Sequence, residues 1–183
     1  NYKISNDPYI HIEKKNTTRS IKRGVNKSRW PINRIIKSGY ALITLDYNDV
    51  DPDKNNFSDG IHSLFYENGN IKPKDNQWGS IAAWSWGFSR VLDFLENESL
   101  INTKKIVLLG HSRLGKTALW AGAKDERFGI VISNNSGCGG AALSKRRFGE
   151  KVSDINTNYP HWFAKNFHKY NDKESLLEVD QHM

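Results

Sequence analysis

The sequence contains a single cysteine, Cys138, among its 183 residues. This count excludes an internal disulfide and a metal cluster built on cysteines. No apolar run approaches the roughly 20 residues that a membrane-spanning helix requires. The first residues, Asn1 to Ile4, do not resemble a signal peptide. The hydrophobic content of 37% and the mean hydropathy of −0.68 are low for a compact α/β enzyme. We therefore expect no membrane partner.

The charge is unbalanced, with a formal net charge of +7 that would suit nucleic acid, an anionic polysaccharide or simple solubility. The basic residues occur in short scattered groups, among them Lys14-Lys15, Lys22-Arg23 and Lys145-Arg146-Arg147, and they form no stripe. No motif of an RNA- or DNA-binding domain accompanies them. We therefore expect no nucleic-acid partner.

The most informative stretch is KKIVLLGHSRLGKTAL, from Lys104 to Leu119. Its apolar residues Ile106 to Leu109 are long enough for a buried strand and too few for a helix, and they end at Gly110. Most of the residues from Ala118 to Ala123 are good helix formers. The stretch therefore predicts a strand, a tight turn and a helix.

Two chemistries use this arrangement. Residues Gly110 to Thr117 match the phosphate-binding pattern G-x-x-x-x-G-K-[ST], in which Thr117 would bind magnesium. The alternative is a nucleophile elbow, in which the turn exposes the Ser112 hydroxyl above the edge of a parallel sheet. The elbow pattern G-x-S-x-G is imperfect here, because Leu114 occupies the place of its second glycine.

The neighbouring sequence weakens the phosphate-binding interpretation. Such a site also needs an acidic residue at the end of an adjacent strand to hold magnesium. The next apolar run, Ile130 to Asn134, ends in asparagines, and Asp46 would serve only if an upstream strand took that place. Bulky Arg113 and Leu114 are unusual where a backbone must wrap a phosphate. The residues alone leave both chemistries open, with an ordinary strand-to-helix turn as a third possibility.

Other segments predict repeating strand and helix units. A helix begins near Pro31, carries isoleucines at helical spacing, and ends at Ser38-Gly39. The apolar run Tyr40 to Tyr47 predicts a central parallel strand. A clear amphipathic helix extends from Ser80 to Glu96, and its Trp84 and Trp86 are expected to pack in the core. The chain is therefore expected to have an α/β fold.

Polar clusters in the loops give weaker signals. Four aspartates lie between Asp46 and Asp53, and we interpret them as turn chemistry around Pro52, with no catalytic role. His62 lies in an insertion-like loop and is expected to be exposed. The glycine-rich segment Ser136 to Gly140 follows the second apolar strand, where ligands of α/β proteins bind.

The run Ile106 to Glu150 resembles the glucuronoyl esterases, the α/β-hydrolases of carbohydrate esterase family 15. Their elbow is G-x-S-R-x-G-K, which matches Gly110 to Lys116, and further similarity covers Ser28 to Asp53 and Trp78 to Glu96. The resemblance implies a three-layer α/β/α sandwich of the α/β-hydrolase fold, incomplete at both ends. Residues 1–183 would form one partial catalytic domain, without the N-terminal strands and the C-terminal region that bears the catalytic histidine.

The resemblance also implies roles for individual residues. Ser112 would be the nucleophile, and Arg113 would stabilise the oxyanion through its backbone N–H and its side chain. Lys116 and Glu150 would bind the uronate sugar. Asn135 departs from the fungal pattern, which has the triad carboxylate there, so the acid would come from a later loop, as in bacterial members.

The family hydrolyses esters that link 4-O-methyl-glucuronic acid of glucuronoxylan to lignin alcohols, and no metal or organic cofactor is implied. A serine esterase of this type would be secreted or periplasmic, would act in lignocellulose degradation, and is expected to be a monomer. Two alternatives stay open: a nucleotide-binding protein that uses Gly110 to Thr117, and a carbohydrate-binding domain without catalysis.

Overall fold

The computed structural model describes residues 28, 30–66, 72–144 and 149–173, and the chain divides into two compact units, Asn1–Thr44 and Leu45–Met183. In the first unit, α1 spans Ile32–Lys37 and ends at Ser38, and Gly39 follows with a φ of 84°. The predicted helix is confirmed, and a glycine stands where the backbone must turn left-handed.

The strand predicted over Tyr40 to Tyr47 is not formed. Residues 40–46 have no regular secondary structure, and Tyr47–Asp49 form the short 3-10 helix η1. A central strand needs hydrogen-bonded neighbours, and the sheet in the described residues contains β1 and β2 alone. The strand prediction is therefore wrong, and no other strand pairs with this segment among the described residues.

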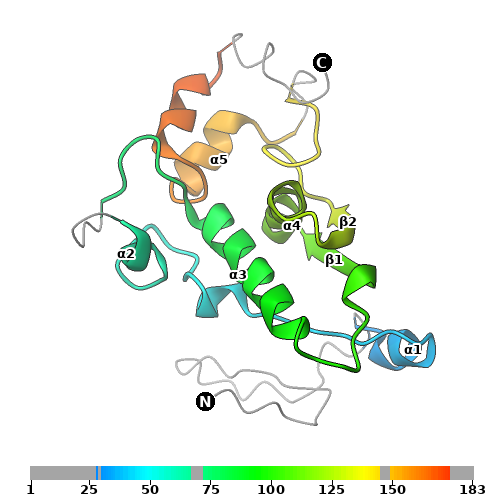
Figure 1. Ribbon diagram of the computed structural model, residues 1–183. Coiled ribbons are helices and arrows are strands. Elements are labelled where there is room, and N and C mark those ends of the chain that lie inside the picture. The colour runs from blue at the N-terminus through cyan, green and yellow to red at the C-terminus, as the bar shows by residue number, and fades with distance from the viewer. Residues whose placement is uncertain (1–27, 29, 67–71, 145–148, 174–183) are drawn as a thin grey trace, which may run out of the picture. The chain divides into compact units, whose positions relative to one another are not determined.

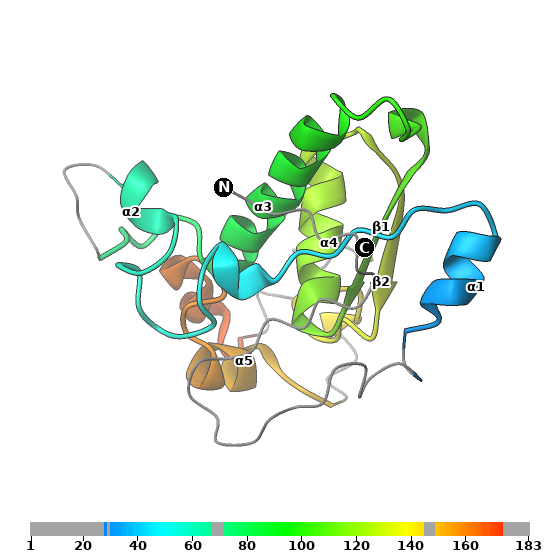
Figure 2. The same ribbon diagram turned by 90° about the horizontal axis from the view of Figure 1, so that it is seen from below.

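The centre of the second unit is a parallel βαβ arrangement. β1 (Ile106–His111) and β2 (Phe128–Asn134) pair in parallel, with Leu108 opposite Val131 and Gly110 opposite Ser133, and α4 (Arg113–Lys124) connects them. The long helix α3 (Ser80–Leu95) packs against α4, so that α4 lies between α3 and the strands (Figures 1 and 2). The predicted strand–turn–helix–strand sequence is confirmed.

The two faces of this small sheet differ. On one face, Leu108 of β1 packs with Ala118 and Ala121 of α4. The helix lies so close that a Cβ added at Gly122 would overlap the side chain of Val131. The opposite face carries apolar side chains that are between 42% and 58% exposed: Val107, Leu109, Ile130 and Ile132.

A larger apolar cluster forms beyond the carboxyl ends of the strands. Trp84 of α3 belongs to this cluster and is only 1% exposed, whereas Trp86 on the same helix is 37% exposed. Further elements around it are α2 (His62–Phe65), α5 (Val152–Asn158) and η5 (Lys165–Tyr170). The carbonyls of His161 and Trp162 accept the first N–H groups of α3, at 2.8 and 3.2 Å. The start of α3 thereby anchors residues 161 and 162.

The prediction that His62 is exposed is wrong. Its side chain is fully buried, and Nδ1 lies 2.8 Å from Oδ1 of Asp51, whose side chain is also fully buried. The ring stacks on Trp78 with a centroid distance of 4.5 Å. Nδ1 of the histidine thus has a partner eleven residues away in the chain, whereas Nε2 is buried and has no hydrogen-bond partner among the described residues. No local pattern in the sequence indicates this pairing.

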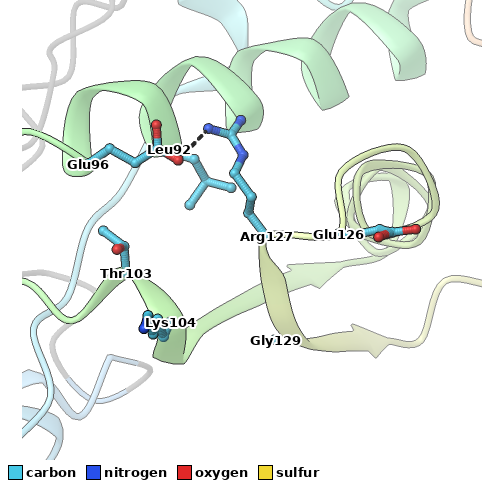
Figure 3. A pocket seen from close by; sticks show the side chains of 7 residues that line it. All are labelled: Leu92, Glu96, Thr103, Lys104, Glu126, Arg127 and Gly129. Atoms are coloured by element: carbon cyan, nitrogen blue, oxygen red, sulfur yellow. Dashed lines mark hydrogen bonds and ion pairs between the residues drawn. The ribbon is translucent and has the colours of Figure 1, made fainter.

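One surface hollow of about 320 Å³ lies at the amino ends of the strands (Figure 3). Arg127 crosses it, with Nη1 at 3.0 Å from Glu96 Oε1 and 2.9 Å from Asp93 Oδ1. Hydrogen bonds from Arg127 hold the pKa of Asp125 well below its usual range. The hollow is lined by Thr103 and Lys104, which precede β1, and it therefore lies at the end of the sheet opposite to Ser112.

None of the helices in the described ranges is long and apolar enough to cross a membrane.

Candidate active site

Ser112 occupies a sharp turn between β1 and α4. Its φ of 57° and ψ of −123° are rare for a residue with a side chain. Its N–H donates to the carbonyl of Asn134 at 2.9 Å, and its carbonyl accepts from the N–H of Gly115 at 2.8 Å. The side chain is exposed. This strained backbone, held on both sides, is the geometry of a nucleophile elbow.

Packing explains why the second glycine of the elbow is Gly115 and not the residue at position 114. A Cβ at Gly115 would lie 3.0 Å from Cβ of Ser136 and 3.2 Å from the carbonyl oxygen of Asn134. Leu114 instead packs against the apolar cluster around Trp84. A side chain at position 115 would therefore crowd Asn134 and Ser136, whereas a leucine is accommodated at position 114.

Gly110 is the most constrained residue of the turn. A Cβ at this position would overlap the carbonyl of Leu114 and would lie 2.8 Å from the backbone nitrogen of Gly115. We expect Gly110→Ala to lower the free energy of unfolding by about 3 kcal/mol, because backbone atoms would have to move. Denaturant unfolding of the complete protein that carries this sequence would measure the loss.

Gly129→Ala provides the matched control for that substitution. Gly129 lies in β2, and a Cβ there would meet its nearest atom, the carbonyl oxygen of Ile106, at an ordinary 3.6 Å. The control should change stability by less than about 1 kcal/mol. Equal effects of the two substitutions would contradict the assigned packing.

Arg113 begins α4 and is surrounded by an acidic and aromatic group. Its Nη1 forms an ion pair with Oδ2 of Asp53. The guanidinium lies 5.0 Å from the centroid of Trp162 and 5.6 Å from that of Tyr159, and the two rings stack on each other at 3.9 Å. Because Arg113 is the first residue of the helix, its N–H has no acceptor within the helix. An anion above Ser112 would meet this N–H and the positive end of the helix dipole.

Lys116 is buried, with only 5% of the residue exposed. Its ammonium group donates to the carbonyl of Ser136 and lies 5.7 Å from the centroid of Trp162. Burial lowers the pKa of Lys116, and the negative charge of Glu150 partly opposes this shift. The structure therefore holds a desolvated cation one helical turn beyond Ser112.

The residues predicted to bind the sugar lie around the same loop. A Cβ at Gly137 would lie 3.7 Å from Oε2 of Glu150 and 3.8 Å from Nζ of Lys116. Glu150 is exposed, and Gly137 has a φ of 63°. The glycine-rich segment after β2 thus brings a carboxylate and an ammonium group to the edge of the sheet that carries Ser112.

The environment of Thr117 does not favour a phosphate-binding loop. Thr117 is fully buried, and its hydroxyl donates to the carbonyl of Arg113 at 3.0 Å, so it is not directed toward a metal ion. The match of this segment to the phosphate-binding pattern is therefore a coincidence of residue types.

Asp53 has contacts that the acidic cluster in the sequence did not predict. Asp53 was assigned to turn chemistry, yet its carboxylate contacts Arg113, His161 and Trp162. The aspartates around Pro52 were a visible feature of the sequence, but they did not indicate which residues Asp53 would contact.

Asn135 occupies the position at which the sequence departs from the fungal pattern. It is exposed and has a φ of 48°, a conformation that asparagine adopts more readily than most residues.

The described residues place Ser112 on an exposed, strained turn, next to Arg113 and one helical turn before the buried Lys116. The comparisons with known proteins identify the family. The sequence family described as glucuronyl esterase, fungi, matches residues 12–183. The chain belongs to the glucuronoyl esterase family. The α/β-hydrolase fold predicted from the sequence is thereby confirmed.

Particular relatives support this assignment. Carbohydrate esterase MZ0003, from an unknown prokaryotic organism, is 53% identical over 169 residues, which cover 92% of this chain and 39% of that protein. The 4-O-methyl-glucuronoyl methylesterase of Cerrena unicolor is 35% identical, over 81% of this chain and 32% of that protein. The solved glucuronoyl esterase from Solibacter usitatus superposes with a TM-score of 0.82 at 46% identity, over 88% of this chain and 41% of that one. The chain thus spans between about one third and two fifths of the length of these relatives.

Proposed function

We propose that this chain provides the nucleophile and part of the sugar-binding site of a serine esterase that cleaves esters of 4-O-methyl-glucuronic acid. The observation that carries the proposal is the exposed, strained Ser112 at the start of α4, next to Arg113. The relatives are named for 4-O-methyl-glucuronoyl ester cleavage and for carbohydrate ester cleavage.

In the proposed reaction, Ser112 Oγ attacks the carboxyl carbon of the uronate ester and gives its proton to a histidine base. The negative charge that develops on the carbonyl oxygen is stabilised by the backbone N–H and the guanidinium of Arg113. The alcohol leaves with the proton from the histidine, and water then hydrolyses the acyl-enzyme. Three of the described histidines already have side-chain partners, His62 with Asp51, His161 with Asp53 and His111 with Asn134. We propose that both the base and its acid come from outside the described residues.

Lys116 and Glu150 would bind the sugar hydroxyls of the uronate. An ammonium group can donate to these hydroxyls, and a carboxylate can accept from them. Their charged groups both approach the position that a Cβ at Gly137 would occupy, which supports a shared role. We further expect a secreted monomer that acts on glucuronoxylan bound to lignin, which size-exclusion chromatography and fractionation of the producing cells would test.

The function is tested by hydrolysis of benzyl glucuronate by the complete protein, with methyl glucuronate and an acetyl ester as comparisons. We expect cleavage of both glucuronate esters and much weaker cleavage of the acetyl ester. Magnesium-dependent binding of a nucleotide would favour the phosphate-binding alternative. Binding of glucuronoxylan without ester cleavage would favour a non-catalytic carbohydrate-binding domain.

The charge of Lys116 gives a prediction about pH. Since burial lowers the pKa of Lys116, the cation is lost at a lower pH than for an exposed lysine, and kcat/KM should fall on the alkaline side. Lys116→Met should reduce kcat/KM by about 10- to 50-fold near neutral pH through the lost charged hydrogen bond and should remove this alkaline decline. Lys124→Met, at the exposed end of the same helix, is the matched control.

The same shift has a consequence for stability. Between the lowered pKa and the usual lysine value, the unfolded chain binds more protons than the folded chain, so this group makes the protein more stable as pH rises. Lys116→Met should remove that alkaline gain. An unchanged pH dependence of both kcat/KM and unfolding in Lys116→Met would contradict the assignment.

A further inference from the structure

Asp53 is the point at which three separate segments of the site meet. Its Oδ2 forms the ion pair with Nη1 of Arg113. Its Oδ1 lies 2.9 Å from Nε2 of His161 and accepts from Nε1 of Trp162 at 2.8 Å. The side chain of Asp53 is 11% exposed, compared with 32% for Arg113. The carboxylate is therefore more buried than the arginine that it contacts.

The protonation of His161 follows from its surroundings. Burial lowers the pKa of His161, which favours the neutral ring. Its Nδ1 is buried and has no hydrogen-bond partner in the described part of the chain. The neutral tautomer with hydrogen on Nε2 satisfies the contact to Asp53, because the carboxylate accepts and the ring donates. His161 and Trp162 thus both donate to Oδ1, and Oδ2 is left to Arg113.

A partly exposed arginine side chain has many rotamers, and restricting it to one of them costs conformational entropy. Here the ion pair fixes one end of the guanidinium, and the ring of Trp162 lies 5.0 Å from its carbon. The planar group has further N–H donors on Nε and Nη2. Donors that already point where charge develops stabilise a transition state without a reorganisation cost.

We propose that Asp53 is a positioning residue that orients the Arg113 guanidinium toward the developing oxyanion. Asp53 receives its own orientation from His161 and Trp162, which are in turn anchored by the start of α3. Trp162 also lies beside Lys116, so one ring borders both cations of the site. This inference rests on the proposed esterase function.

The test is Asp53→Asn in the complete protein, assayed with benzyl glucuronate. Asparagine keeps the size of the side chain and removes the charge that holds Arg113. We expect kcat to fall by about 10- to 100-fold, as for a misplaced catalytic group, with KM changed by less than about twofold because Lys116 and Glu150 still bind the sugar. Asp49→Asn is the matched control, since Asp49 is exposed in η1 and loses the same charge.

A double substitution separates positioning from a general structural effect. If Asp53 acts through Arg113, Asp53→Asn should cause no further loss of kcat in an Arg113→Ala background. Equal losses of kcat with and without Arg113 would overturn the proposal, as would an unchanged kcat in Asp53→Asn. If Asp53→Asn fails to fold, Asp53→Glu keeps the charge but changes its reach, and the same comparison applies with an expected loss of about tenfold.

The wild-type protein and Ser112→Ala decide the proposed function within the same assay. An inactive wild-type protein would remove the esterase assignment and with it any role of Asp53 in that reaction. An active wild-type protein with an unaffected Asp53→Asn variant would leave the esterase in place and refute only the positioning role.

Discussion

Ser112→Ala is expected to lower kcat on benzyl glucuronate by at least about 10⁴-fold, because no other group can form the acyl-enzyme. The fold should persist, since the backbone of Ser112, and not its hydroxyl, makes the hydrogen bonds to Asn134 and Gly115. Binding of the uronate product should be retained. The loss is measured by steady-state hydrolysis, and mass spectrometry after a reactive phosphonate should show no adduct on the variant.

Ser153→Ala is the control for this experiment. Ser153 lies in α5, and its hydroxyl donates to Asp172 at 3.0 Å. This variant should keep both hydrolysis and the phosphonate adduct. Substantial glucuronate cleavage by a correctly folded Ser112→Ala variant would be incompatible with the proposed nucleophile.

Arg113→Ala is expected to lower kcat by about 10²- to 10³-fold, the usual effect of removing one oxyanion donor. The backbone N–H remains in the variant, so some stabilisation of the oxyanion should persist. KM should change little, because the contact strengthens only as charge develops on the oxygen. Steady-state kinetics on benzyl and methyl glucuronate would separate the two parameters.

Arg90→Ala is a matched control for Arg113→Ala. Arg90 also lies over a tryptophan, 5.2 Å from the centroid of Trp86, and also pairs with an aspartate, Asp93, at 3.1 Å. It lies outside the proposed site, and its removal should leave kcat unchanged. A large effect on KM alone in Arg113→Ala would indicate ground-state binding and would contradict stabilisation of the oxyanion.

Local patterns in the sequence were sufficient to predict the centre of the fold. The apolar runs at β1 and β2 and the periodicity of α3 depend on neighbours a few residues apart, and the observed elements agree within a few residues. The prediction of a strand from Tyr40 was wrong. A strand depends on a pairing partner, and the composition of a segment does not indicate whether one is present.

The site was predicted in part, for a related reason. Ser112 and Arg113 lie at a turn whose strand, glycine and helix are contiguous in the chain. Asp53 and His62 were misassigned because each pairs with a residue distant in sequence or buried by the fold. Charge and turn residues indicate a loop, but they do not indicate which side chain a loop residue will meet.

The contacts of Asp53 also bear on the order in which the protein folds. Its bonds to His161 and Trp162 span 108 and 109 residues, whereas the turn at Ser112 is built from adjacent strand and helix residues. Closing long loops is entropically costly, and topologies with distant contacts fold slowly. A refolding chain should therefore recover its helical circular dichroism signal first. The oriented arginine, and with it the capacity for turnover, would be restored last.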